Sequence, residues 1–358
     1  MTKNSPRYYV PLLFIGMISM VIGIWVGLVR MGWQWAVPHD GLVMMHGPLM
    51  VGGFLGTVIG MERAVAAKKV WGFLAPLFSA LAAILYLAFP GKESLALLFL
   101  TASSFFMVLV FIFMLKRHID AATLVMAIGA AVWFLGNLAW LSGYSIPQVV
   151  LWWSGFLIIT IVGERLELTR FLNISKQQYT VLYGLLILLG IGFLFSLFNL
   201  DWAMRISGLA NLALSIWLLR NDIARRSVKK PGLTRFLALA LLAGYFWLGL
   251  SGIMGMYFGG IAAGPYYDAI IHTVFVGFAF SMIFGHAPII FPALLHVKIL
   301  YRQVYFIPLF LLHLSLLVRI FGDVTLLMDY RLWGSLISGV AIVLFFMMIL
   351  SSVRKAEY

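Results

Sequence analysis

Cysteine is absent from the 358 residues of the sequence. Without a thiol, the chain forms no disulfide and offers no thiolate ligand to zinc, to an iron–sulfur cluster or to a covalently attached c-type heme. A catalytic thiol nucleophile is excluded for the same reason. Any redox chemistry therefore depends on histidine, methionine, tyrosine or a cofactor that is held without a covalent bond.

Charged side chains are also scarce, at 10% of the sequence, whereas 63% of the residues are hydrophobic and the mean hydropathy is +1.04. A water-soluble globular domain does not have this composition. A helix needs about 20 apolar residues to cross the hydrocarbon core of a bilayer, and the sequence repeats such runs between short charged breaks. We therefore predict an all-α polytopic membrane protein. Its twelve predicted spans are residues 8–31, 41–62, 71–90, 93–115, 120–143, 147–168, 178–199, 201–219, 234–258, 266–292, 303–322 and 330–352.

The 25 basic residues are distributed unevenly between the two ends of these spans. Twenty fall on one side and five on the other, so the positive-inside rule predicts that both termini are cytoplasmic. The net charge of +13 then reflects membrane orientation rather than a nucleic-acid partner. The first span is not followed by a small-residue cleavage pattern, so we expect a retained helix rather than a signal peptide. We expect a single transmembrane domain over residues 1–358, surrounded by the lipid of a bacterial-type inner (cytoplasmic) membrane.

Ionisable side chains are costly inside a bilayer and therefore mark candidate functional positions. Four of the seven histidines fall within predicted spans: His46, His272, His286 and His313. His46 is expected about five residues below the outer end of the second span, and His272 about six below the outer end of the tenth. Both spans run in the same direction, so the two imidazoles are expected at similar depth. A six-coordinate heme b needs two such imidazoles.

The face of the second span continues below His46 at helical spacing through Met50 and Gly53. Five glycines occur between residues 47 and 60, and such small residues leave room either for a flat macrocycle or for a closely packed helix. We predict that His46 and His272 ligate one heme b, with Met50 and Gly53 beside it. The alternative is that the two histidines are unrelated groups that form hydrogen bonds between helices.

A second site in the inner leaflet is a further hypothesis. His286 lies 14 residues beyond His272, and on an α-helix this spacing returns to within about 40° of the same face, about 21 Å deeper. The spacing favours a second heme or a metal such as copper, with His313 as another candidate ligand. The opposing interpretation is that His286 bonds to a backbone carbonyl that Pro288 or Pro292 leaves without a donor.

Arg319 lies within the eleventh predicted span, near its outer end. An outer-leaflet heme would direct its propionates toward this side chain, because a guanidinium pairs with a carboxylate through two parallel hydrogen bonds. Otherwise Arg319 would extend to the membrane surface. Asp268 lies one turn before His272 and is expected either to orient nearby groups or to interact with the helix dipole. No acidic residue is expected at mid-membrane depth, which disfavours a proton pump or a cation symporter.

Two segments resemble subunit I of the heme-copper oxidases. MHGPLMVGGF, residues 45–54, is similar to the His-Gly-x-x-Met signature of that family's second helix, and HTVFVGFAFSMIFGHAPIIFP, residues 272–292, is similar to its tenth helix. The resemblance implies that His46 and His272 ligate a low-spin heme. Ile270 stands where that family has a second heme-binding histidine, and the sixth and seventh spans contain no histidine for copper. The resemblance therefore does not extend to the dinuclear oxygen-reducing centre.

The tenth span also resembles a late helix of the NnrS family, which are smaller twelve-span heme proteins linked to the nitric oxide response. His272, Gly277 and Met282 match the His-x4-Gly-x4-Met spacing of that helix. A second segment resembles the same family more weakly, in a motif of a glycine, an arginine and a later Thr-Arg pair: Gly163, Arg165, Thr169 and Arg170. In this sequence the motif is two residues shorter than in the family and lacks the family's proline.

These features lead us to expect an NnrS-like heme b membrane protein that acts in electron transfer or in nitric oxide handling, with a quinol or another membrane redox partner. A heme-dependent oxidoreductase would need an open iron position or a second metal, for which His286 is the obvious anchor. Two other classes stay open: a secondary transporter of a small solute, and an assembly factor that handles heme or metal. The short loop between the sixth and seventh spans disfavours the transporter, in which two six-helix halves are joined by a long link.

Overall fold

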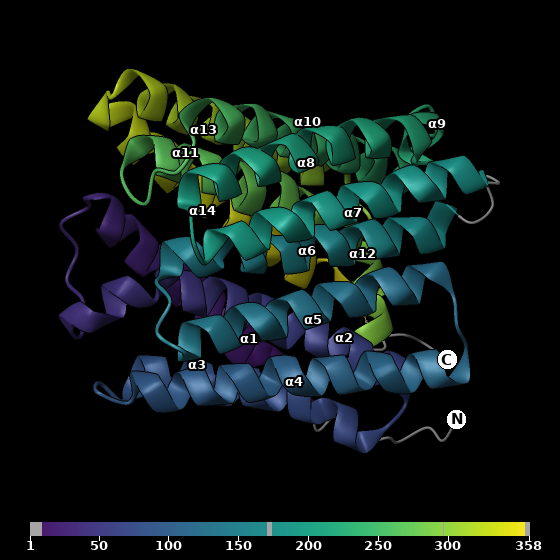
Figure 1. Ribbon diagram of the computed structural model, residues 1–358, viewed down its shortest axis with the longest axis horizontal. Coiled ribbons are helices and arrows are strands. Elements are labelled where there is room, and N and C mark those ends of the chain that lie inside the picture. The colour runs from purple at the N-terminus through teal and green to yellow at the C-terminus, as the bar shows by residue number, and fades with distance from the viewer. Residues whose placement is uncertain (1–8, 170–173, 296, 355–358) are drawn as a thin grey trace. The chain divides into compact units, whose positions relative to one another are not determined.

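The computed structural model describes residues 9–169, 174–295 and 297–354 (Figure 1). The chain forms two compact units, Met1–Ile119 and Asp120–Tyr358. Both are built of helices, and the sheet found within the described residues is a single antiparallel pair of two-residue strands, β1 (Lys298–Ile299) and β2 (Val353–Arg354).

The first unit has four membrane-length segments, and the second of these is not a regular α-helix. In chain order the elements of this unit are α1 (Val10–Met31), η1 (Asp40–Met45), η2 (Pro48–Gly56), α2 (Thr57–Ala67), η3 (Val70–Phe73), α3 (Leu74–Ala88) and α4 (Glu93–Arg117). η1 and η3 are short 3₁₀ helices, whereas η2 is a π-helix. α1 and α3 both pack against η2, so the irregular segment lies inside the unit rather than at its surface.

The second unit holds the remaining helices. Its elements are α5 (Ala121–Leu141), α6 (Ile146–Thr169), α7 (Lys176–Ser196), α8 (Leu200–Asn221), α9 (Ala224–Ser227), α10 (Leu233–Phe258), α11 (Pro265–His272), η5 (Thr273–Phe280), α12 (Ser281–Leu295), β1, η6 (Gln303–Tyr305), α13 (Phe306–Thr325), α14 (Met328–Ser351) and β2. Asp120, Ser175 and Asn199 each accept a hydrogen bond from a backbone N–H in the first turn of the following helix, which fixes the starts of α5, α7 and α8. Consecutive helices pack as hairpins, and η5 lies against α10.

The predicted number of spans is confirmed, because twelve helical segments within the described residues are long and apolar enough to cross a membrane. The protein is therefore an all-α polytopic membrane protein. The second span is the one whose position was predicted poorly, since it covers Pro48–Ala67 rather than residues 41–62. Residues 40–45 form a 3₁₀ helix instead, and the helix continues to Ala67, past Glu62 and Arg63, which form an ion pair with each other.

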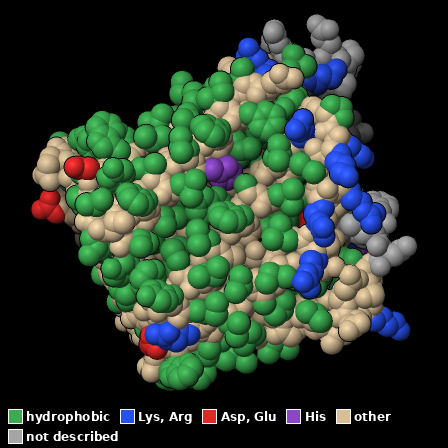
Figure 2. Space-filling model, turned by 90° about the horizontal axis from the view of Figure 1, so that it is seen from above, with side chains coloured by type: hydrophobic (Ala, Val, Ile, Leu, Met, Phe, Trp, Pro, Cys, Tyr) green, Lys and Arg blue, Asp and Glu red, His purple; other side chains and the backbone are tan. Residues whose placement is uncertain are grey.

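The outer side of α13 shows how the second unit meets lipid. Between residues 306 and 321 of this helix, the exposed side chains repeat every three or four residues and are large and apolar: Ile307, Phe310, Leu314, Leu317 and Phe321. This spacing places them on one face of a helix. Figure 2 shows hydrophobic side chains over most of one face of the molecule, with Lys and Arg gathered along one edge. Such a face is expected to contact acyl chains, with the basic residues at the membrane surface.

Glycines bring α8 and α10 unusually close together in the second unit. A methyl group added at Gly208 would lie 2.7 Å from the carbonyl oxygen of Gly252, and one added at Gly252 would lie 2.5 Å from that of Gly208. Small residues at membrane helix interfaces permit this close backbone approach. The contact brings Asn211 of α8 next to Ser251 of α10.

Candidate functional site

A π-helix follows each of the two histidines that were predicted to bind heme. η2 begins two residues after His46, and η5 begins directly after His272. The i→i+5 hydrogen bonds of a π-helix are rare in proteins and occur often at functional sites. Both segments lie in the spans that resemble the heme-binding helices of the oxidases.

The prediction that Met50 and Gly53 lie beside a heme assumed α-helical spacing below His46, whereas Pro48–Gly56 form a π-helix. Their place beside a heme stays a prediction. A methyl group at Gly53 would lie 3.0 Å from Cβ of Ser19 and 3.1 Å from Cβ of Ala83, so this position faces α1 and α3. The Met50 side chain packs against α1, where its sulfur would lie 2.7 Å from a Cβ at Gly23. Gly53 thus permits close packing of η2 against α1 and α3, which is one of the two uses expected of these glycines.

His46 follows the last residue of η1 and packs against α1. The prediction had placed it more than one turn inside the second membrane helix. Its Nδ1 is 2.7 Å from the carbonyl oxygen of Gly23. Gly27 makes room for the ring, because a methyl group there would lie 2.5 Å from Nδ1. A carbonyl oxygen only accepts hydrogen bonds, so in the neutral imidazole Nδ1 carries the proton and Nε2 carries the lone pair.

His272 has the same tautomer for a related reason. Its Nδ1 is 2.9 Å from the backbone carbonyl oxygen of Asp268 and 3.1 Å from the Oδ1 atom of the same residue. Both atoms are acceptors, so Nδ1 donates and Nε2 carries the lone pair. Asp268 therefore orients His272, as one of the two sequence interpretations proposed.

Arg319 forms a buried, bidentate ion pair with Asp268. Its Nε and Nη2 atoms each lie 2.8 Å from a carboxylate oxygen, and the residue is only 7% exposed. The side chain therefore does not extend to the membrane surface. Arg319 binds the carboxylate of Asp268, the residue whose oxygens accept hydrogen bonds from His272. A contact between Arg319 and heme propionates stays a prediction.

A second ion pair lies at the same end of the unit, and sequence reasoning missed it. Asp323 is fully buried near the end of α13, and its Oδ1 accepts a hydrogen bond of 2.6 Å from Nε of Arg331. Asp323 also interacts electrostatically with Asp268 and Arg319. The four-residue spacing between Arg319 and Asp323 puts both on one helix face and could have indicated that Asp323 lies near Arg319, but it does not point to Arg331 as the partner of Asp323.

The two histidines of the hypothetical inner site differ from each other. His286 Nδ1 lies 2.7 Å from the carbonyl oxygen of Met282, so its Nε2 also carries the lone pair. That acceptor is not the carbonyl of Phe284, which Pro288 would leave without its helical donor. His313 Nδ1 instead accepts a hydrogen bond of 2.9 Å from Nε1 of Trp247.

This hydrogen bond has a chemical consequence for His313. An indole nitrogen only donates, so the neutral His313 ring carries its proton on Nε2. A protonated nitrogen has no lone pair for a metal, and the structure thus disfavours His313 as a ligand through Nε2. The π-helix η5 also lies between His272 and His286, so the α-helical calculation that put them on one face does not apply. Across the described ranges, no group of three or more His, Asp or Glu side chains is close enough to hold a metal ion.

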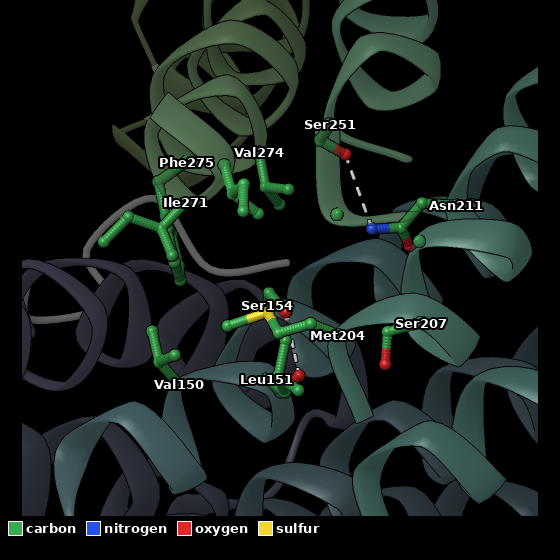
Figure 3. Close-up of a pocket in the computed structure, with 13 residues that line it drawn as sticks. Val150, Leu151, Ser154, Met204, Ser207, Asn211, Ser251, Ile271, Val274 and Phe275 are labelled. Atoms are coloured by element: carbon green, nitrogen blue, oxygen red, sulfur yellow. Dashed lines mark hydrogen bonds between the residues drawn. The ribbon is translucent and has the colours of Figure 1, made fainter. Parts of the chain in front are cut away.

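A water-sized cavity of about 20 Å³ lies beside the segment that carries His272 (Figure 3). Ile271, Val274 and Phe275 form one side of it. On the other side, Asn211 Nδ2 donates a hydrogen bond of 3.4 Å to Ser251 Oγ, while Asn211 Oδ1 is buried without a hydrogen-bond partner among the described residues. A buried acceptor of this kind is commonly satisfied by an internal water.

Arg165, part of the weak NnrS-like motif, is buried at the other end of the unit. It pairs with Asp222 through Nε at 2.6 Å and Nη2 at 3.0 Å, and the hydroxyl of Tyr245 donates to the same carboxylate at 2.9 Å. Gly163 packs against α5, since a methyl group there would lie 2.9 Å from the carbonyl oxygen of Ala122. These two motif residues therefore join helices. Of the other two, Arg170 lies outside the described residues, as does the side chain of Thr169.

Comparison with known proteins identifies the family of the chain but not its activity. No curated protein and no solved structure matches the chain. The model of one family, described as a domain of unknown function (DUF8744), matches residues 9–354. This match covers nearly the entire sequence. The chain therefore belongs to the DUF8744 family.

Proposed function

We propose that this protein binds heme b, with the imidazoles of His46 and His272 as axial ligands, in the manner of NnrS-like proteins of the bacterial inner membrane. One observation carries the proposal: in both residues Nδ1 donates to a protein oxygen, which leaves the lone pair on Nε2. Histidines that bind metals almost always donate their other ring N–H to a carboxylate or a backbone carbonyl. The sequence resemblance at both positions is independent support.

The residues around His272 suit a ligand that must keep one orientation. The hydrogen bond from Nδ1 to Asp268 fixes both the tautomer and the orientation of the ring. Arg319 compensates the buried charge of Asp268 through two hydrogen bonds. A heme b with two imidazole ligands supplies single-electron transfer and leaves no open iron position. This favours electron transfer with a membrane redox partner, such as a quinol, as the activity.

The test is the heme content and the reduced spectrum of purified His46→Ala and His272→Ala variants. We expect each substitution to abolish the low-spin spectrum, because each removes one of two axial ligands. His118→Ala is the matched control, since His118 is exposed at the end of α4 and should leave the spectrum unchanged. If the wild-type protein contains no heme, or if both histidine variants keep a normal spectrum, the proposal fails and a transporter becomes the better hypothesis.

A further inference from the structure

A polar pocket lies where α8 ends and α9 begins in the second unit, at the end predicted to be cytoplasmic. Its volume is about 430 Å³, within the usual range for ligand sites. The polar side chains that line it are Gln178, Arg220, Asn221, Asp222, Arg225 and Arg226.

The uncharged and acidic groups of this pocket are already satisfied by the protein. Asp222 accepts hydrogen bonds from Arg165, Tyr245 and the backbone N–H of Ala224. The Asn221 side chain donates to the carbonyl oxygen of Trp217 at 2.8 Å and accepts from Gln178 at 2.6 Å. The Asp222 charge is thus compensated by Arg165, and these groups do not offset the charge of the remaining arginines.

Three guanidinium groups are left facing the pocket: those of Arg220, Arg225 and Arg226. All three side chains are exposed, and over the described part of the chain none of them forms an ion pair with an acidic residue. Guanidinium groups bind phosphate oxygens through paired hydrogen bonds. The pocket therefore carries an uncompensated charge that suits a phosphate ester.

An apolar groove adjoins this pocket and shares two of its arginines. The groove has a volume of about 600 Å³ and is lined by Ile216, Leu219 and Leu242 together with Arg220 and Arg225. Ile216 is 42% exposed within the membrane span formed by α8. A ligand that reaches both spaces would need a phosphate at one end and a hydrocarbon chain at the other.

We propose that this end of α8 binds an anionic phospholipid, with the phosphate on Arg220, Arg225 and Arg226 and one acyl chain along Ile216, Leu219 and Leu242. Basic pockets at the cytoplasmic side of membrane helices recognise such headgroups. A free phosphate would fill the polar pocket but not the groove. The site is separate from the histidines and does not depend on heme binding.

The experiment is a titration of the delipidated full-length protein in detergent with phosphatidylglycerol or phosphatidylcholine, with bound lipid counted by native mass spectrometry. The wild-type protein should bind phosphatidylglycerol at least tenfold, on the order of 1.4 kcal/mol, more tightly than it binds phosphatidylcholine. The double variant Arg220→Gln/Arg225→Gln should weaken that binding about 25-fold, at roughly fivefold for each arginine. The matched control Lys229→Gln/Arg235→Gln removes two exposed charges outside the pocket and should weaken it only about twofold.

Two further measurements are needed. One distinguishes binding of the whole lipid from binding of its phosphate alone, and the other uses a variant that leaves the arginines in place. Glycerol 3-phosphate should fail to displace phosphatidylglycerol at equal concentration, because it cannot occupy the groove. Leu219→Trp, which fills the groove without changing any charge, should weaken lipid binding several-fold. Equal losses in the two double variants, equal binding of the two lipids, displacement by glycerol 3-phosphate, or unchanged binding in Leu219→Trp would each overturn the proposal.

Discussion

The ring nitrogen that carries the proton distinguishes the candidate ligand histidines from one another more clearly than their predicted depth in the membrane does. His286 shares the arrangement of His46 and His272, whereas His313 accepts a hydrogen bond at Nδ1. If His286 contributes to a second heme or metal site, His286→Ala will lower the heme or metal content per protein. His313→Ala should leave that content unchanged, because its Nε2 carries a proton. Metal analysis and heme quantification check both variants, and an unchanged stoichiometry in His286→Ala would make His286 a structural residue.

Arg319 should be important for stability because its partner is buried. Arg319→Leu would leave the Asp268 carboxylate without its compensating charge, and removal of one partner of a buried ion pair typically costs about 3 to 5 kcal/mol. We therefore expect a clear fall in Tm. Arg205→Leu is the matched control, since its pair with Asp201 is exposed, with side chains 41% and 51% accessible, and should change Tm little. Similar Tm values for the two variants would contradict the structural role of Arg319.

The contact between α1 and His46 gives a prediction at the scale of the helix. Gly27→Ala places a methyl group 2.5 Å from Nδ1 of His46 and should displace the ring, which lowers heme occupancy. Overpacking of this kind commonly costs about 1 to 3 kcal/mol. Gly184→Ala is the control, because no atom lies within 4 Å of the added methyl group, and alanine favours a helix over glycine. Heme content and Tm should fall only in Gly27→Ala. Equal heme content in the two variants would show that the position of the His46 ring does not depend on the absence of a side chain at Gly27.

The helical elements differ in how far sequence could predict them. The apolar runs predicted the twelve spans well, because a membrane span depends mainly on local length and composition. The π-helices η2 and η5 could not be predicted, since both segments are almost wholly apolar and carry no periodic pattern that would distinguish i→i+5 from i→i+4 hydrogen bonds. Arguments that assumed α-helical spacing across η2 or η5, such as the one for Met50 and Gly53, therefore do not follow from the observed backbone.

At the scale of the whole molecule, the main limit was pairing between distant residues. Arg319 and Asp268 are 51 residues apart, and Arg165 and Asp222 are 57 apart. A single sequence identifies each charge as unusual but does not identify its partner. The histidine and arginine positions were thus recognisable as candidates, whereas the carboxylates that orient or compensate them required the structure.

The orientation of the whole chain in the membrane is also testable. The excess of basic residues on one side predicts that both termini are cytoplasmic. A phosphatase reporter that is active only in the periplasm should therefore be inactive when it is fused at Glu357, a residue outside the described ranges, and active when it is inserted after Gly143 in the turn following α5. The reverse pattern of activity would invert the predicted depth of His46 and His272.

His46 and His272 are proposed to occupy both axial positions of a heme b. The most direct measurement is the visible spectrum of the purified, dithionite-reduced wild-type protein before and after exposure to carbon monoxide. A six-coordinate heme has no open iron position, so we predict a low-spin reduced spectrum that carbon monoxide does not change. A protein without any heme spectrum, or a reduced heme that binds carbon monoxide immediately, would contradict the claim.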